Sequence, residues 1–195
     1  MPSIIDYPIV LQRMQQQGFK SLYHNSGAFA LPPQPPASVV AWIGPPDPSI
    51  RPEALPLVRQ IRSPFEFELA MMTRWQWEKN FAAGVAWLMP MSHWAFECSQ
   101  DWMVSLLKSN GLDPKALRNR NDAAAIQFEL AEGHEFGFFL RDLLTNLISS
   151  DFTLAFPGQS TLCTVHHHKQ LWWSTQDGTV FAALESLARD CAAVP

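Results

Sequence analysis

Residues Leu162 to Ser174 read Leu-Cys-Thr-Val-His-His-His-Lys-Gln-Leu-Trp-Trp-Ser. Threonine, valine and tryptophan favour extended structure, so this segment is predicted to be one β-strand whose alternate side chains point to opposite faces. One face is apolar at both ends and is expected to cover the core: Cys163, Val165, His167, Lys169, Leu171 and Trp173. The other face carries two imidazoles and a large aromatic ring: Thr164, His166, His168, Gln170 and Trp172.

The length and composition indicate a folded domain. At 195 residues the chain fits one domain, and we predict a single α+β domain over residues 1–195. Hydrophobic residues make up 47% and charged residues 16%, a composition far from that of disordered chains. Eight tryptophans and thirteen phenylalanines predict a core, or a core and a contact surface, built largely from aromatic rings.

Strand and helix patterns are interspersed along the chain. Alternating or buried apolar runs predict strands at 38–43, 85–89, 126–130 and 152–156. Helices are predicted at 6–18, 53–62, from His93 or Ser99 to Ser109, from Asp113, and at 179–191. The clearest helix begins after Gly133, where apolar residues follow the three-and-four spacing: Phe136, Phe139, Leu140, Leu143, Leu144, Leu147 and Ile148.

This order of elements predicts an α+β fold with a mixed, mostly antiparallel sheet and helices packed on one face. Proline-rich loops are expected at 32–36 and 45–56. Residues 63–78 set two rules against each other, because Ser63 and Glu66 match a helix capping box while the apolar residues alternate as in a strand. We expect a long strand there, forming a hairpin with the strand at 85–89.

Charge and cysteine content narrow the class of protein. A formal charge of −4 and a pI near 5.8 argue against a nucleic-acid-binding protein, which needs clustered basic residues. The three widely spaced cysteines fit free thiols in a reducing compartment. Neither a secretion signal nor a membrane-spanning stretch is visible, so a cytoplasmic location is expected.

The histidines suggest a metal site. Two imidazoles at positions i and i+2 on one strand face can bind one ion, and a third ligand would complete the shell. Candidates for that ligand are His134 or Glu135, and also His93 or Glu97. A metal-dependent or acid–base hydrolase using a divalent ion at His166, His168, His134 and Glu135 is therefore one hypothesis. Alternatively, these histidines are ordinary polar residues of a sheet.

A second hypothesis is binding. No assembled catalytic motif is present, and an outward Trp172 beside His166 and His168 predicts a contact surface that includes Gln170. The expected partner is another protein or a second copy of the chain, with neither nucleic acid nor a membrane involved. A third hypothesis is a small-molecule carrier with an aromatic-lined pocket.

Overall fold

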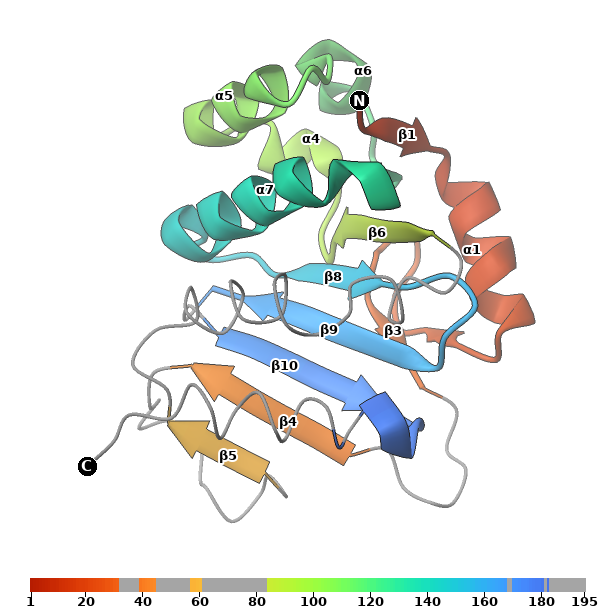
Figure 1. The fold of residues 1–195 in the computed structure, drawn as a ribbon. Coiled ribbons are helices and arrows are strands. Elements are labelled where there is room, and N and C mark those ends of the chain that lie inside the picture. Colours follow the sequence, from red (N-terminus) through yellow and green to blue (C-terminus); the bar gives the residue numbers. More distant parts are fainter. Residues whose placement is uncertain (32–38, 45–56, 61–83, 168–169, 181, 183–195) are drawn as a thin grey trace.

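The computed structural model of this chain describes residues 1–31, 39–44, 57–60, 84–167, 170–180 and 182. Within them eight strands form one sheet, in the order β1-β7-β6-β8-β9-β10-β4-β5 (Figure 1). Its strands are β1 (Ser3–Ile5), β4 (Val39–Gly44), β5 (Leu57–Gln60), β6 (Val85–Pro90), β7 (Ala125–Glu129), β8 (Phe152–Ala155), β9 (Thr161–His166) and β10 (Gln170–Thr175). The other elements are α1 (Tyr7–Gln16), β2 (Lys20–Ser21), β3 (Phe29–Ala30), α4 (Trp94–Glu97), α5 (Asp101–Ser109), α6 (Pro114–Arg118), the 3-10 helix η2 (Leu130–Glu132) and α7 (Gly133–Asn146).

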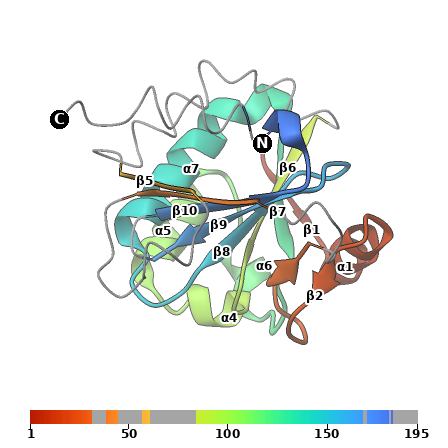
Figure 2. The ribbon, with the colours of Figure 1, turned by 90° about the horizontal axis from the view of Figure 1, so that it is seen from below.

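The predicted α+β class with a mixed, mostly antiparallel sheet is confirmed. Neighbouring strands of the large sheet pair antiparallel except β4 and β5, which are parallel. Helices α4, α5 and α7 pack on one side of the sheet, and Figure 2 shows α1 on the other side. The sheet therefore has two buried faces, each with its own apolar cluster.

The segment Leu162–Ser174 forms a hairpin, so the prediction of one continuous strand is wrong. β9 ends at His166, and after three residues β10 begins at Gln170 and runs antiparallel to β9. The reversal was not evident from the sequence because His-His-Lys contains none of the usual turn residues. Thr164 lies opposite Trp172, so even-numbered residues face even-numbered residues. Among the described strand residues, Cys163 to His166 and Leu171 to Trp173, the two predicted sets therefore remain on separate faces after the chain reverses.

The larger core lies between the sheet and α4, α5 and α7. Trp173 stacks on Phe156 with ring centroids 6.0 Å apart. Phe128 meets Phe136 and Phe139 edge-on at 5.3 and 5.6 Å, so the predicted apolar stripe of the long helix faces the core from Phe136 to Leu147. Ile148, the last residue of that stripe, lies beyond the end of α7 and is exposed, so the prediction is wrong there. Trp173 and Phe128 belong to one apolar cluster with residues of α4, α5 and α7, so β10 and β7 face the same helical layer.

Two cysteines belong to this core. Cys98 and Cys163 are both fully buried, and Cys163 lies on the core face predicted for it. Burial raises the pKa of the Cys98 thiol to about 11 and that of the Cys163 thiol well above its ordinary value. Both thiols therefore stay protonated near neutral pH and pack as small apolar groups.

Several local predictions need correction. Residues Leu57–Gln60 form strand β5 beside β4, so the helix predicted over 53–62 is wrong there. Pairing with a neighbouring strand, which the sequence alone does not reveal, overrides the weak helical pattern. The helix predicted to start at His93 or Ser99 and to end at Ser109 agrees with α5 for the start at Ser99. The start at His93 is wrong, because α4 ends before Cys98 and α5 begins only at Asp101.

Other predictions fall outside the described residues. They include the proline-rich loops at 32–36 and 45–56, the strand at 63–78, and most of the last helix, which begins at 178–180. The strand predicted at 85–89 is β6, and it pairs with β7 on one side and with β8 on the other. Its two neighbours are therefore not the segment 63–78 with which the sequence predicts a hairpin. Among the helices of the described ranges, none has the length and apolar content that crossing a membrane requires.

The opposite face of the sheet is held by α1 and the loop that joins β2 to β3. In that loop Gly27 donates its main-chain N–H to the carbonyl of Pro90 at 3.0 Å, and Ser26 donates its hydroxyl to the carbonyl of Met91. A Cβ atom at Gly27 would lie closer than 3.0 Å to the Pro90 oxygen and to Met89. Only glycine allows this close approach, which fixes the end of β6.

Replacing Gly27 by alanine is therefore expected to destabilise the protein by roughly 1–3 kcal/mol, the usual cost of overpacking a buried contact. Urea unfolding of the variant measures this directly. Gly178→Ala is the matched control, because a Cβ at Gly178 meets nothing within 4 Å. Equal stability of the two variants would contradict the close approach.

Candidate metal centre

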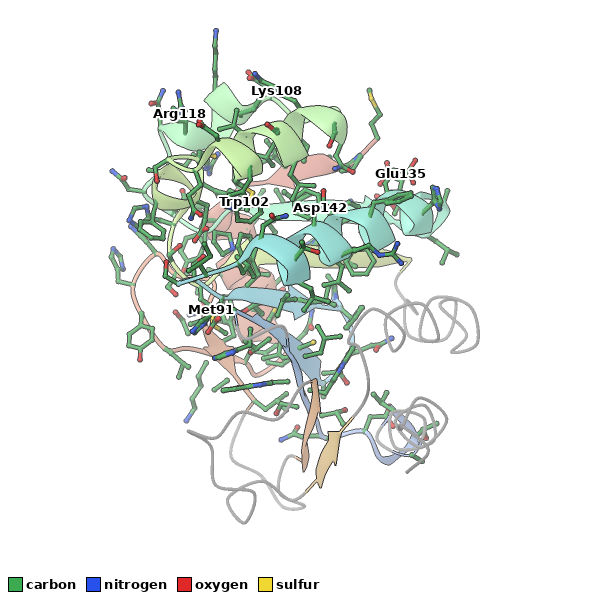
Figure 3. All side chains as sticks on the ribbon, turned by 90° about the vertical axis from the view of Figure 1, so that its left-hand side faces the viewer. Met91, Trp102, Lys108, Arg118, Glu135 and Asp142 are labelled. Carbon is green, nitrogen blue, oxygen red and sulfur yellow. The ribbon has the colours of Figure 1, made fainter. Side chains whose placement is uncertain are left out.

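Four neighbouring strands bring their ends to one edge of the sheet. β6 and β9 end at this edge, while β8 and β10 begin there. The edge lies at the left in Figure 1 and faces the viewer in Figure 3, where Met91 marks the residue directly after β6. Asp151 directly precedes β8 and His166 closes β9, so antiparallel pairing of these strands brings the two residues together.

Asp151 is held by main-chain and side-chain contacts. Its carbonyl accepts the main-chain N–H of Met91 at 2.8 Å, which ties it to the end of β6. Its carboxylate oxygen Oδ1 accepts the main-chain N–H of His167 at 2.9 Å and lies 2.8 Å from Nδ1 of the same residue. The aspartate therefore joins the segment before β8 to the turn after β9.

His166 lies between two other rings. Its imidazole stacks on the indole of Trp172 with centroids 4.2 Å apart and an angle of 11° between the planes. The His166 ring also stacks on the ring of His167, with centroids 4.2 Å apart and an angle of 30° between the planes. Because Trp172 and His166 share a strand face, the stack follows from the register of the hairpin. It restricts the orientations that the imidazole can adopt.

His167 does not lie on the core face predicted for it. It follows the last residue of β9, so the alternation of the strand no longer applies to it. Its side chain is 27% exposed, compared with 23% for Asp151 and 10% for His166. The group is thus reachable from solvent while most of its surface is buried.

The three side chains have the arrangement of potential metal ligands. One ligand atom from each of Asp151, His166 and His167 lies within 4.8 Å of the other two. The Oδ2 atom of Asp151 and the Nε2 atom of His166 are 3.8 Å apart, which is too long for a direct hydrogen bond. A zinc ion binds such atoms at about 2.1 Å, so two ligand atoms of one ion lie at most about 4.2 Å apart. The 3.8 Å pair is within this limit, and a pair at 4.8 Å would have to move closer to bind the same ion.

A buried hydroxyl lies on the same face of the sheet. Thr153 is opposite Thr164 in the β8–β9 pairing and is 1% exposed. Within the described part of the chain its Oγ1 has no hydrogen-bond partner. A buried polar group of this kind is normally satisfied by a water or ion when protein partners are lacking. Thr153 therefore adds a polar group to the face of the sheet that carries His166 and Trp172.

The structure brings together only part of the predicted site. His166 and Trp172 are in contact, as expected for side chains on one face. His168 and the side chain of Gln170 lie outside what the structure describes. The other predicted ligands, His134 and Glu135, are in the first turn of α7, whereas Asp151 follows its end.

At a rise of about 1.5 Å per residue, the fourteen residues of α7 separate its two ends by about 20 Å. Figure 3 shows Glu135 on this helix, away from Met91. The His134 ring packs against Phe138 with centroids 4.6 Å apart. The structure therefore does not bring His134 or Glu135 to His166.

The remaining candidate ligands have other roles. Nδ1 of His93 accepts the main-chain N–H of Phe96 and caps α4. Glu97 is fully buried and accepts hydrogen bonds from the hydroxyls of Ser92 at 2.5 Å and Ser150 at 3.0 Å. Burial raises the pKa of Glu97 above its ordinary value, and these two hydrogen bonds oppose that rise.

Asp151 and His167 were missed from the sequence. An aspartate directly before a predicted strand was a visible signal, but the sequence does not show that this strand pairs with β9. Comparisons with protein families, with curated proteins and with solved structures give no match for this chain.

The raised pKa of Glu97 predicts a pH dependence. The native state keeps the Glu97 proton to higher pH than the unfolded state does, so its contribution to stability is complete below pH 4.5 and is lost as the pH rises through the native pKa. Glu97→Gln has no proton to lose at this position. The free energy of unfolding of the variant should therefore increase relative to wild type between about pH 4 and about pH 8.

Urea unfolding of both proteins in metal-free buffer across this range tests the prediction. Each pH unit between the unfolded and native pKa values is worth about 1.4 kcal/mol. A difference between variant and wild type that stays constant with pH would show that Glu97 titrates normally.

Proposed function

We propose that this protein binds a divalent transition-metal ion through Asp151, His166 and His167 and uses it in a hydrolytic reaction. The observation that supports this most directly is the convergence of three ligand atoms within 4.8 Å at a partly exposed edge of the sheet. One carboxylate and two neutral imidazoles suit a dication electrostatically, because the carboxylate compensates part of its charge.

The ligand types favour one class of metal. Imidazole nitrogens suit zinc, iron, copper and nickel, whereas magnesium and calcium prefer shells made of oxygen atoms. Two histidines and one aspartate therefore favour Zn²⁺ over Mg²⁺. The contact of Asp151 Oδ1 with Nδ1 of His167 resembles the carboxylate–histidine pairs that orient metal-binding imidazoles in other proteins.

The three ligands found among the described residues also favour a reactive site over a structural one. Structural zinc sites usually have four protein ligands, whereas catalytic sites keep a position for water or substrate. Zinc lowers the pKa of such a water and provides a nucleophile near neutral pH. The partial exposure of His167 and Asp151 supports access by water and a small substrate.

Metal binding is tested by titrating the purified, untagged, metal-free protein with Zn²⁺ and Co²⁺ in a calorimeter. Wild type should bind one ion, and Asp151→Asn and His166→Ala should each weaken binding by at least tenfold, as expected for loss of a ligand or of its support. His134→Ala is the matched control, because His134 is at the far end of α7. A wild type that binds neither ion would refute the proposal.

A second candidate function is binding of another protein or of a second copy of this chain through the surface formed by Trp172 and His166. The observation that favours it is the flat indole–imidazole stack, in which Trp172 is only partly buried. Partly buried tryptophans are common among the residues that contribute most to protein interfaces.

If Trp172 is central to such an interface, Trp172→Ala should weaken association by more than tenfold without unfolding the protein. Sedimentation measures self-association, and co-purification with wild type and variant measures a different partner. Phe138→Ala is the control, because Phe138 is an exposed aromatic residue on α7. A monomeric wild type that captures no partner would remove this candidate.

A further inference from the structure

We infer that Glu97 is a positioning residue for Asp151, holding the segment that presents the Asp151 carboxylate to His166 and His167. The role of this segment in holding a metal rests on the proposed function, whereas its effect on the Asp151–His167 contact does not. Glu97 is 53 residues away from Ser150 in the chain, so the link between them depends on the fold.

The Glu97 carboxyl joins two connections that both lead to the site. Its Oε1 accepts the hydroxyl of Ser92, in the connection from β6 to α4. Its Oε2 accepts the hydroxyl of Ser150, in the connection from α7 to β8. Ser150 directly precedes Asp151, and the main-chain N–H of Met91 donates to the Asp151 carbonyl. The two connections are thus linked once through the main chain and once through Glu97.

These contacts restrict the backbone of Asp151 from both sides. The Ser150 hydroxyl is held by Glu97 on α4, and the Asp151 carbonyl is held by Met91, the residue after β6. With its backbone fixed, the Asp151 side chain reaches His167 by adopting one rotamer. Loss of the Ser150–Glu97 hydrogen bond would release the residue immediately before the aspartate.

A buried carboxyl group at this position costs more free energy than an apolar side chain would. Burying it costs free energy, which is reflected in its raised pKa, and an apolar side chain would avoid that cost. Glu97 is 0% exposed and sits beside apolar core residues such as Trp94 and Cys98. The presence of a carboxyl group here is explained if its two hydrogen bonds fix the position of the site.

The other buried glutamate provides a contrast. Glu132 accepts the main-chain N–H of Glu129 in a capping box and forms an ion pair with the amino group of Met1. The partners of the Glu132 carboxylate thus lie beside the start of α7 and at the N-terminus. The contacts of Glu97, by comparison, lie next to Asp151.

The test uses the full chain with Glu97→Ala, Ser150→Ala and Glu97→Gln, and with Glu132→Ala as the matched control. The first readout is the ¹⁵N and ¹H signals of the His167 imidazole in the metal-free protein, which report its hydrogen bond with Asp151. The second is the affinity for Co²⁺ and the visible absorption spectrum of the bound ion, which report ligand geometry.

Glu97→Ala and Ser150→Ala should change the His167 signals, weaken Co²⁺ binding about tenfold and alter its spectrum, as loss of outer-shell support does elsewhere. Glu97→Gln keeps an acceptor and a donor for the two serines, so it should preserve both readouts. Glu132→Ala should lower the unfolding temperature and leave both readouts unchanged. If Glu97→Ala does not fold, Ser150→Ala and Glu97→Gln give the same comparison.

Two results would overturn the inference: His167 signals and Co²⁺ spectra that match wild type in Ser150→Ala, or changes of equal size in Glu132→Ala. A wild type that binds no Co²⁺ while its His167 signals respond to Ser150→Ala would refute the proposed function and support the positioning role. The two failures are therefore distinguishable.

Discussion

The alternation of side chains along the β9–β10 hairpin is the constraint on which the site depends. It directs Cys163, Val165, Leu171 and Trp173 into the core that the sheet shares with α4, α5 and α7, where Trp173 stacks on Phe156. The same alternation leaves His166 and Trp172 on the opposite face, one against the other. Packing on one side of the strand therefore fixes the ring positions on the other.

Much of the fold follows from sequence patterns that act locally. The spacing of apolar residues in α7, the proline after Asp113 and the alternation in β7 and β8 all predict the observed elements. Local patterns failed where pairing between distant segments decides the outcome. Leu57–Gln60 is a strand because β4 lies beside it, and the reversal between His166 and Gln170 carries no common turn residue.

The candidate site shows the same limit. His166 and Trp172 could be placed on one face because they belong to one hairpin, where the alternation of side chains along the strands is enough to relate them. Asp151 belongs to another strand, and its approach to His167 depends on the β8–β9 pairing and on the main-chain bond from Met91. The predicted ligand set therefore included His166 but took its carboxylate from Glu135 on α7, whereas the carboxylate that lies beside His166 is that of Asp151.

The short connection between β9 and β10 limits how this chain can vary in length. With three residues between His166 and Gln170, even-numbered positions oppose even-numbered positions across the hairpin. If β9 kept its place and the connection kept three residues, inserting one residue would shift β10 by one position, turning Trp172 toward the core under α7 and Trp173 away from Phe156. An inserted residue is therefore tolerated only where the connection lengthens to hold it and the pairing of β9 with β10 is kept, a restriction that composition alone would never reveal.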